Sequence, residues 1–165
     1  MGWTNKGKMR AWEAFFRDGV QCRAVLLTDA LDLSDPAVLA DINTMSQLTE
    51  IPAGNGYSAG GILLTRNSTD FPTVTEDDSQ NLAKVTMRDL SWPASGGPIP
   101  VSGTGAAFLA CVDNNVTPGS REALFVLDIR DGSQTLRNVS DGQPLTIGDT
   151  AGGNPITLTL GDPAA

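Results

Sequence analysis

Four glycines within eight residues restrict the fold of this chain more than any other feature of the sequence. They are Gly54, Gly56, Gly60 and Gly61. Because glycine adopts backbone angles that residues with a side chain avoid, the segment 54–61 predicts a sharp corner. The apolar run 62–65 follows directly and has the length of a strand. We therefore expect a structural corner, including Tyr57, that directs a buried strand.

The corner contains the pattern G-x-S-x-G at residues 56–60, which surrounds the nucleophile of many hydrolases. A serine in such an elbow needs a base to take its proton, usually a histidine. The chain has no histidine, and its three lysines form no S-x-x-K arrangement. A strand is expected after the motif, where a hydrolase has a helix. We interpret Ser58 as structural and predict no catalytic residue.

Composition favours one domain built from many short strands. A chain of 165 residues can bury a core of its own, and 18 glycines with 10 prolines suit strands joined by turns. We expect an N-terminal arm or helix at residues 1–20. Residues 21–165 are expected to form a single β-sandwich domain.

The net charge of -8 argues against nucleic acid as a partner, since phosphate binding needs a clustered basic surface. The charge is uneven, because residues 1–23 hold five basic and two acidic side chains. This basic start could dock on an acidic surface of another protein. A solvated helix face explains it equally well.

The two cysteines, Cys22 and Cys111, both lie in apolar runs and are expected to be buried thiols. The sequence leaves open a disulfide between them. No Cys-x-x-Cys motif or Cys/His cluster is present, so we predict no metal site and no cofactor. No apolar run has the length of a signal peptide core or a membrane span. Synthesis in the cytoplasm without secretion, and no membrane partner, are expected.

Apolar residues recur at three- and four-residue spacing in residues 5–17, which predicts a short amphipathic helix. Its apolar stripe could cover the protein's own core or anchor a partner subunit. If the segment docks on a partner, the residues expected to do so are Trp3, Lys6, Lys8, Arg10, Trp12, Phe15 and Phe16.

Eight to nine short strands are expected in the remaining chain. The candidate strands are 20–28, 47–52, 62–65, 71–74, 82–92, 106–112, 123–129, 143–148 and 156–160. A charged turn at 76–78 precedes the strand 82–92, whose alternation slips as a bulge would cause. A helical turn capped at Asp35 is expected at 37–42, and 106–112 should pair with 123–129 in a hairpin. The predicted class is an all-β, antiparallel, jelly-roll-like sandwich with a short N-terminal helix.

The order of these segments resembles a family of small structural proteins of tailed-bacteriophage virions. The resemblance covers residues 6–160 and is carried by the strand 22–28, the corner 54–61, a strand closing on Ser91-Trp92, and the hairpin 110–113 with 127–129. Trp92 and the glycine corner are its most specific parts. The chain departs from the family near its C-terminus, where 145–147, the Gly152-Gly153 turn and 156–160 replace a tryptophan-bearing strand.

This resemblance implies a non-enzymatic virion component, a homo-oligomer whose partners are the major capsid protein or other virion subunits. The leading hypothesis is a capsid cement or decoration protein that stabilises contacts between major capsid subunits. A neck, tail or fibre-attachment component is the alternative. A host-surface or carbohydrate-binding module is a third possibility, for which only Tyr57 and Trp92 offer aromatic rings.

Overall fold

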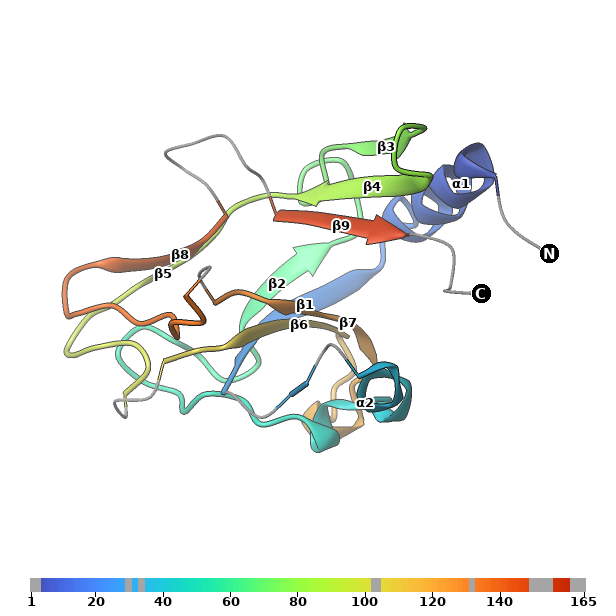
Figure 1. The fold of residues 1–165 in the computed structure, drawn as a ribbon. Coiled ribbons are helices and arrows are strands. Elements are labelled where there is room, and N and C mark those ends of the chain that lie inside the picture. The colour runs from blue at the N-terminus through green and yellow to red at the C-terminus, as the bar shows by residue number, and fades with distance from the viewer. Residues whose placement is uncertain are drawn as a thin grey trace. The chain divides into compact units, whose positions relative to one another are not determined.

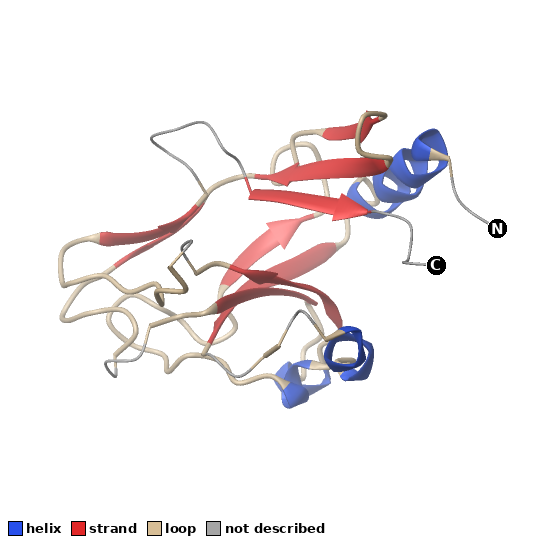
Figure 2. Cartoon of the chain, in the orientation of Figure 1, coloured by secondary structure: helices blue, strands red, loops and turns tan. Residues whose placement is uncertain are grey.

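The computed structural model describes residues 4–28, 31–32, 35–101, 105–130, 133–148 and 156–160 (Figure 1). Strands dominate, with few helical segments among them (Figure 2). The elements are α1 (Asn5–Phe16), β1 (Gln21–Leu27), α2 (Pro36–Asp41), the 3₁₀ helix η1 (Met45–Gln47), β2 (Ile62–Thr65), β3 (Val74–Asp77), β4 (Leu82–Met87), β5 (Leu90–Pro93), β6 (Phe108–Asp113), the 3₁₀ helix η2 (Pro118–Ser120), β7 (Ala123–Asp128), β8 (Pro144–Ile147) and β9 (Ile156–Leu160). The all-β, sandwich-like class with a short N-terminal helix is confirmed.

The chain forms two compact units that do not follow the expected division at residue 20. The N-terminal unit comprises Met1–Val20, Thr65–Leu90 and Thr146–Ala165, and the central unit comprises Gln21–Leu64 and Ser91–Leu145. The division differs because α1 is no separate arm, since it packs on β3 and β4. A two-stranded sheet pairs β5 with β8, and the boundary between the units falls within both strands.

The N-terminal unit contains a three-stranded sheet in the order β3-β4-β9. Both pairings are antiparallel, and Met87 lies opposite Ile156. Alternate residues of β4 are buried, as a strand covered on one face requires. The strand β9 coincides with the expected strand 156–160, whose apolar residues alternate with threonines.

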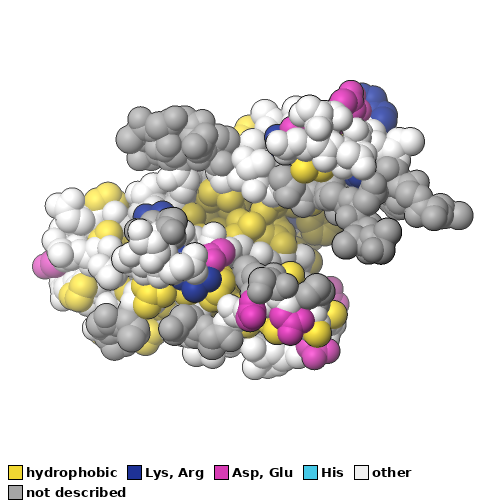
Figure 3. Space-filling view, in the orientation of Figure 1, with side chains coloured by type: hydrophobic (Ala, Val, Ile, Leu, Met, Phe, Trp, Pro, Cys, Tyr) yellow, Lys and Arg dark blue, Asp and Glu magenta, His cyan; other side chains and the backbone are white. Residues whose placement is uncertain are grey.

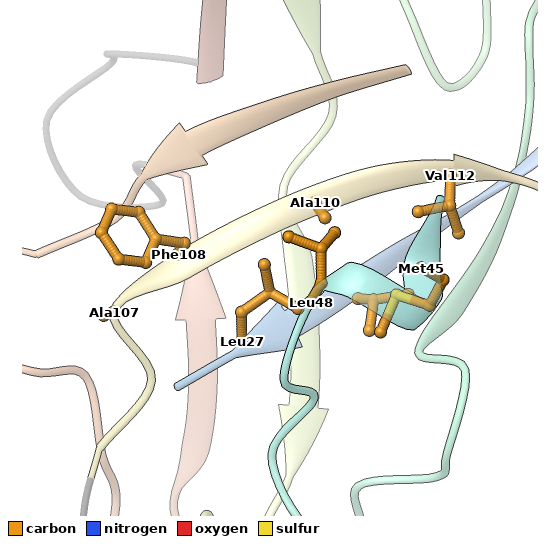
Figure 4. Close-up of a cluster of buried hydrophobic side chains, with 8 residues drawn as sticks. Leu27, Met45, Leu48, Ala107, Phe108, Ala110 and Val112 are labelled. Carbon is orange, nitrogen blue, oxygen red and sulfur yellow. The ribbon is translucent and has the colours of Figure 1, made fainter. Parts of the chain in front are cut away.

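The central unit contains a four-stranded sheet in the order β2-β1-β6-β7. Strand β6 pairs antiparallel with β1 on one side and with β7 on the other, so the expected hairpin is confirmed. Side chains on one face of β1 and β6 meet η1 and the segment after it in a buried apolar cluster (Figure 4). Its labelled members are Leu27, Met45, Leu48, Ala107, Phe108, Ala110 and Val112.

The expected strand 47–52 is wrong. Its first residue ends η1, and only Glu50 bridges to β1, opposite Leu27. The reason is a capping box, in which the Gln47 side chain accepts from the backbone N–H of Thr44. Local side-chain bonds of this kind compete with strand pairing.

The charged turn expected at 76–78 is also wrong in part, because Glu76 and Asp77 belong to β3. Strand β3 begins at Val74, so the expected strand 71–74 is displaced along the chain. Asp77 lies next to Lys84 on the neighbouring strand β4, and the two side chains form an ion pair. This cross-strand pair favours strand over turn.

The cysteines are buried thiols, as expected, and no disulfide joins them. They lie on the paired strands β1 and β6 without being opposite each other, because Cys22 faces Asp113 and Cys111 faces Ala24. The expected helical turn at 37–42 is confirmed by α2, where the Asp35 side chain accepts from the Ala37 N–H.

Candidate functional site

Helix α1 carries most of the candidate docking residues, and one of its faces is fixed to its own unit. The helix begins after Thr4, whose hydroxyl accepts from the Gly7 N–H and caps the first turn. Met9 and Phe16 are buried, and the Phe16 ring lies 4.5 Å from that of Phe71. The apolar stripe therefore covers the protein's own core.

Two of the candidate docking residues lie inside the N-terminal unit. The Lys8 side chain is only 2% exposed, and its Nζ donates a hydrogen bond of 2.7 Å to the backbone oxygen of Asn81. Phe16 is 3% exposed. Lys8 is buried because its chain follows the apolar face of the helix until the ammonium reaches a carbonyl. Neither side chain is available to a partner, so both leave the docking set.

The remaining described candidates differ in exposure. Lys6 and Arg10, one helical turn apart, have side chains 60% and 69% exposed. They form a basic ridge, in which Lys6 is paired with Glu76 and Arg10 with Glu13. Trp12 is half-buried, with its ring 5.2 Å from that of Phe16.

Phe15 is half-buried as well, and the Arg66 guanidinium covers its ring at 4.2 Å from the ring centre. Trp3 lies outside the described residues. The basic ridge is thus the part of the predicted docking set that is most exposed to solvent.

The glycine corner, in the central unit, is a tight backbone turn against a strand. Gly54 and Tyr57 exchange backbone hydrogen bonds of 2.8 and 2.9 Å. Gly61 has φ +60°, and a Cβ atom there would collide with the backbone oxygen of Ala24 on β1. At Gly56 a Cβ would collide with the backbone oxygen of Pro93. Close backbone approach therefore explains these glycines.

Tyr57 joins the corner to β1 through a buried hydrogen-bond network. Its hydroxyl donates to Glu50 Oε1 at 2.8 Å and accepts from the Leu26 N–H at 3.1 Å. The same Glu50 oxygen accepts from the Gly60 N–H at 2.6 Å. Burial, and then the charge of Glu50, raises the pKa of the Tyr57 hydroxyl far above its ordinary value. The hydroxyl thus remains a donor, and the corner is rigidly tied.

The two aromatic residues considered for sugar binding are both inside the central unit. Tyr57 is 2% exposed and Trp92 is 3% exposed, with ring centres 6.1 Å apart. A sugar ring stacks on an exposed aromatic face, and neither residue offers one. The structure places both in the corner's packing, in agreement with the structural interpretation.

The serine of the G-x-S-x-G pattern lies on an exposed turn. Ser58 is exposed, and its backbone oxygen accepts from the Gly61 N–H at 3.0 Å. The strand β2 follows this turn, whereas a nucleophile elbow leads from a strand into a helix. Among the described residues, no group of three or more His, Cys, Asp or Glu could hold a metal ion.

A groove of about 280 Å³ in the central unit escaped the sequence analysis. It lies between α2 and β7 and is lined by Leu39, Ile42 and the four residues Ala123 to Val126. Strand β7 and α2 were both expected, but a groove between elements some 80 positions apart in the chain leaves no local pattern. The one available signal was β7 itself, a five-residue apolar run ending in an acid.

Comparison with protein-family models, with curated proteins and with solved structures finds no match to this chain. In the part of the chain that the structure describes, every helix is too short or too polar to cross a bilayer.

Proposed function

We propose that this chain is a non-enzymatic structural protein of a tailed-phage virion, and that it acts as a capsid cement protein on the major capsid protein. The observation that supports the proposal is the basic ridge on α1. The helix is fixed by Met9 and Phe16, and this presents Lys6 and Arg10 outward on a rigid support. The rest of the chain is strongly acidic. Such a localised basic surface suits docking on an acidic partner.

A cement protein works by adding binding energy across a seam between subunits. Binding to the assembled shell stabilises that state over the separated subunits by mass action. Many copies on a symmetric shell add their effects, since each copy occupies an equivalent site. Virion subunits are the partners in this proposal, and the virion is the location.

The test is to locate the chain on purified particles of the phage that encodes it, by electron microscopy with a specific antibody fragment. Label distributed over the icosahedral shell is the expected result. Label confined to the tail axis would assign a neck, tail or fibre-attachment role and overturn the cement role. Particles that lack the chain altogether would overturn the virion proposal.

The docking surface has its own test, in which the Lys6→Gln, Arg10→Gln double variant is added to shells lacking the chain. Each exposed charged contact at an interface contributes little. We therefore expect the affinity of the double variant for the shells to fall about threefold to tenfold, and to depend less on salt concentration. The matched control is the Gln143→Glu, Asn138→Asp variant, which changes the net charge equally at two exposed positions of the central unit. Equal binding of both variants would remove the ridge from the docking surface.

A further inference from the structure

Strand β7 has an open edge. It is the last strand of the four-stranded sheet, with β6 on its inner side. Directly after its last residue, the Ile129 N–H donates to the Ala107 oxygen, so this N–H points toward the side of β6. Antiparallel pairing alternates along a strand, and Val126 and Asp128 therefore point their N–H and C=O groups outward.

Another part of the chain covers only the beginning of this edge. The Ala123 N–H donates to the Asn43 oxygen, and Met45 donates to the Arg121 oxygen. In the described residues, no segment pairs with the outer backbone groups of Val126 or Asp128. An unpaired edge of this kind is a template for another strand.

The groove between α2 and β7 runs along this open edge. Four consecutive residues of β7 line it, at the place where a register shift against β6 interrupts the regular alternation. Ala123 and Val126 also pack against the buried cluster, so the hollow lies on that face of β7, which is the edge strand of its sheet. The other side is formed by Leu39 of α2, which is 43% exposed, and by Ile42 directly after α2, which packs on the buried cluster. The groove has the form of a slot between a helix and a strand edge.

The apolar content of β7 is incompletely buried. Its first five residues are all apolar and all half-buried, whereas five of the six residues of the neighbouring β6 are fully buried. Covering these side chains would remove apolar surface from water, which stabilises a complex. Strand β7 thus has the apolar composition of an inner strand, although it lies at the edge of the sheet.

The surroundings of the groove are acidic. Figure 3 shows acidic side chains gathered around the region of α2, with hydrophobic side chains exposed among them. Asp35 and Asp41 lie at the two ends of α2, and Glu122 and Asp128 lie at the two ends of β7, all four exposed. Asp128 is paired with Arg130, whose hydrogen bonds lower the pKa of the Asp128 carboxyl. Among the described residues no ion pair involves Asp35, Asp41 or Glu122, so the charge complementary to these three acids is positive.

We propose that the groove binds an extended segment of a partner protein, apolar at alternate positions and flanked by lysine or arginine, which adds to β7 as an antiparallel fifth strand. Backbone groups of the segment pair with Val126 and Asp128. Its alternate side chains enter the slot beside Leu39, and its basic ends meet the acidic rim. Recognition of this kind takes affinity from main-chain bonds and specificity from side-chain pockets. The proposal holds whether or not the chain belongs to a virion.

The experiment uses the whole chain and a panel of synthetic peptides about seven residues long, the length of an ordinary strand, with valine or isoleucine alternating with threonine and lysine at both ends. Binding is measured by fluorescence anisotropy, and the site by backbone amide NMR. We expect saturable binding that shifts the amides of Val126 and Asp128 most. An equivalent peptide with glutamate ends should bind at least tenfold more weakly.

N-methylation of the peptide gives a control that leaves the protein unaltered. Methyl groups on one set of alternate residues block the edge that faces β7, and methyl groups on the other set block the edge that faces away. The methyl groups that face β7 should abolish binding, and those that face away should leave the affinity unchanged. Equal binding of both methylated peptides would overturn the proposal, and so would the absence of binding by every lysine-flanked peptide at millimolar concentration.

A pair of protein variants tests the slot. Leu39→Asp places a charge in the groove at an exposed position and should weaken peptide binding more than tenfold. Val116→Asp makes the same kind of change at a side chain that is 94% exposed outside the groove, and should leave binding unchanged. Equal binding by the two variants would contradict the assigned site. If the β7 amides shift with protein concentration alone, a second copy occupies the edge and the peptide proposal is wrong.

Discussion

The two units of this chain are stabilised in different ways. In the described part of the N-terminal unit, four ion pairs join different segments of the chain, among them Lys84 with Asp77 and Lys6 with Glu76. In the described part of the central unit, the one ion pair given by the geometry is Arg130 with Asp128, two residues apart. That unit depends on buried apolar strands and on backbone approach at the glycine corner. We therefore expect the stability of the N-terminal unit to depend on charge and pH, and the stability of the central unit to depend on how closely its atoms pack.

The largest effect should come from adding a methyl group where the corner touches β1. Gly61→Ala combines φ +60° with a collision against the Ala24 carbonyl, which is backbone and cannot move aside. We expect a loss of about 4 kcal/mol or more in the free energy of unfolding, measured by chemical denaturation.

The matched control is Gly142→Ala, at φ +78° with open space around the position. It carries only the strain of the left-handed backbone, about 1 kcal/mol. Similar losses for the two variants would mean that strain, and not contact with β1, explains the corner.

The next effect should be in the N-terminal unit, where Phe16→Ala removes a buried ring from its contact with Phe71. Large-to-small changes of this kind cost about 3–5 kcal/mol. Amide hydrogen exchange should become faster in β3 and β4, and its rate should change less in β1 and β6. Phe15→Ala, at the half-buried neighbouring position, should cost about 1 kcal/mol. Uniform acceleration over both units would show that they unfold as one.

The smallest effect concerns acid. Hydrogen bonds from Lys84 and then Ser79 lower the pKa of Asp77 to about 2. A carboxyl whose pKa is depressed in the folded state contributes its stabilisation above the unfolded value of about 3.9, and that contribution is lost as pH falls toward 2. Thermal unfolding between pH 5 and pH 2 should therefore show a smaller acid loss for Asp77→Asn than for the native chain.

Lys84→Gln removes the first of these donors and should reduce the acid loss in the same way. The double variant should add little to either single one, because both act on one pair. Additive effects would indicate that the Lys84 ammonium acts on another group.

Local signals in the sequence predicted the parts of the fold that depend on neighbouring residues. The alternation of 156–160 predicted β9, the spacing of apolar residues predicted α1, and the glycines predicted the corner. Each of these patterns is set by the geometry of one element. The class of the fold followed from them because many short strands leave few other arrangements.

Features that depend on distant residues escaped prediction. The burial of Lys8 is made possible by the carbonyl of Asn81, 73 positions away. The groove beside β7 requires α2, which lies far earlier in the chain. Long-range partners of this kind leave no local periodicity. The wrong strand at 47–52 has a local cause instead, because the Gln47 side chain accepts from the Thr44 N–H and favours a 3₁₀ turn.

The segmentation of the units has a consequence for folding. The sheet of the N-terminal unit pairs β4 with β9, which lies about 70 positions later in the chain. A pairing between strands so far apart in sequence must close a long loop, and contacts of this kind form slowly. Until β9 arrives, one edge of β4 is an unpaired strand with which a neighbouring chain can pair. Aggregation during refolding should therefore start from the N-terminal unit.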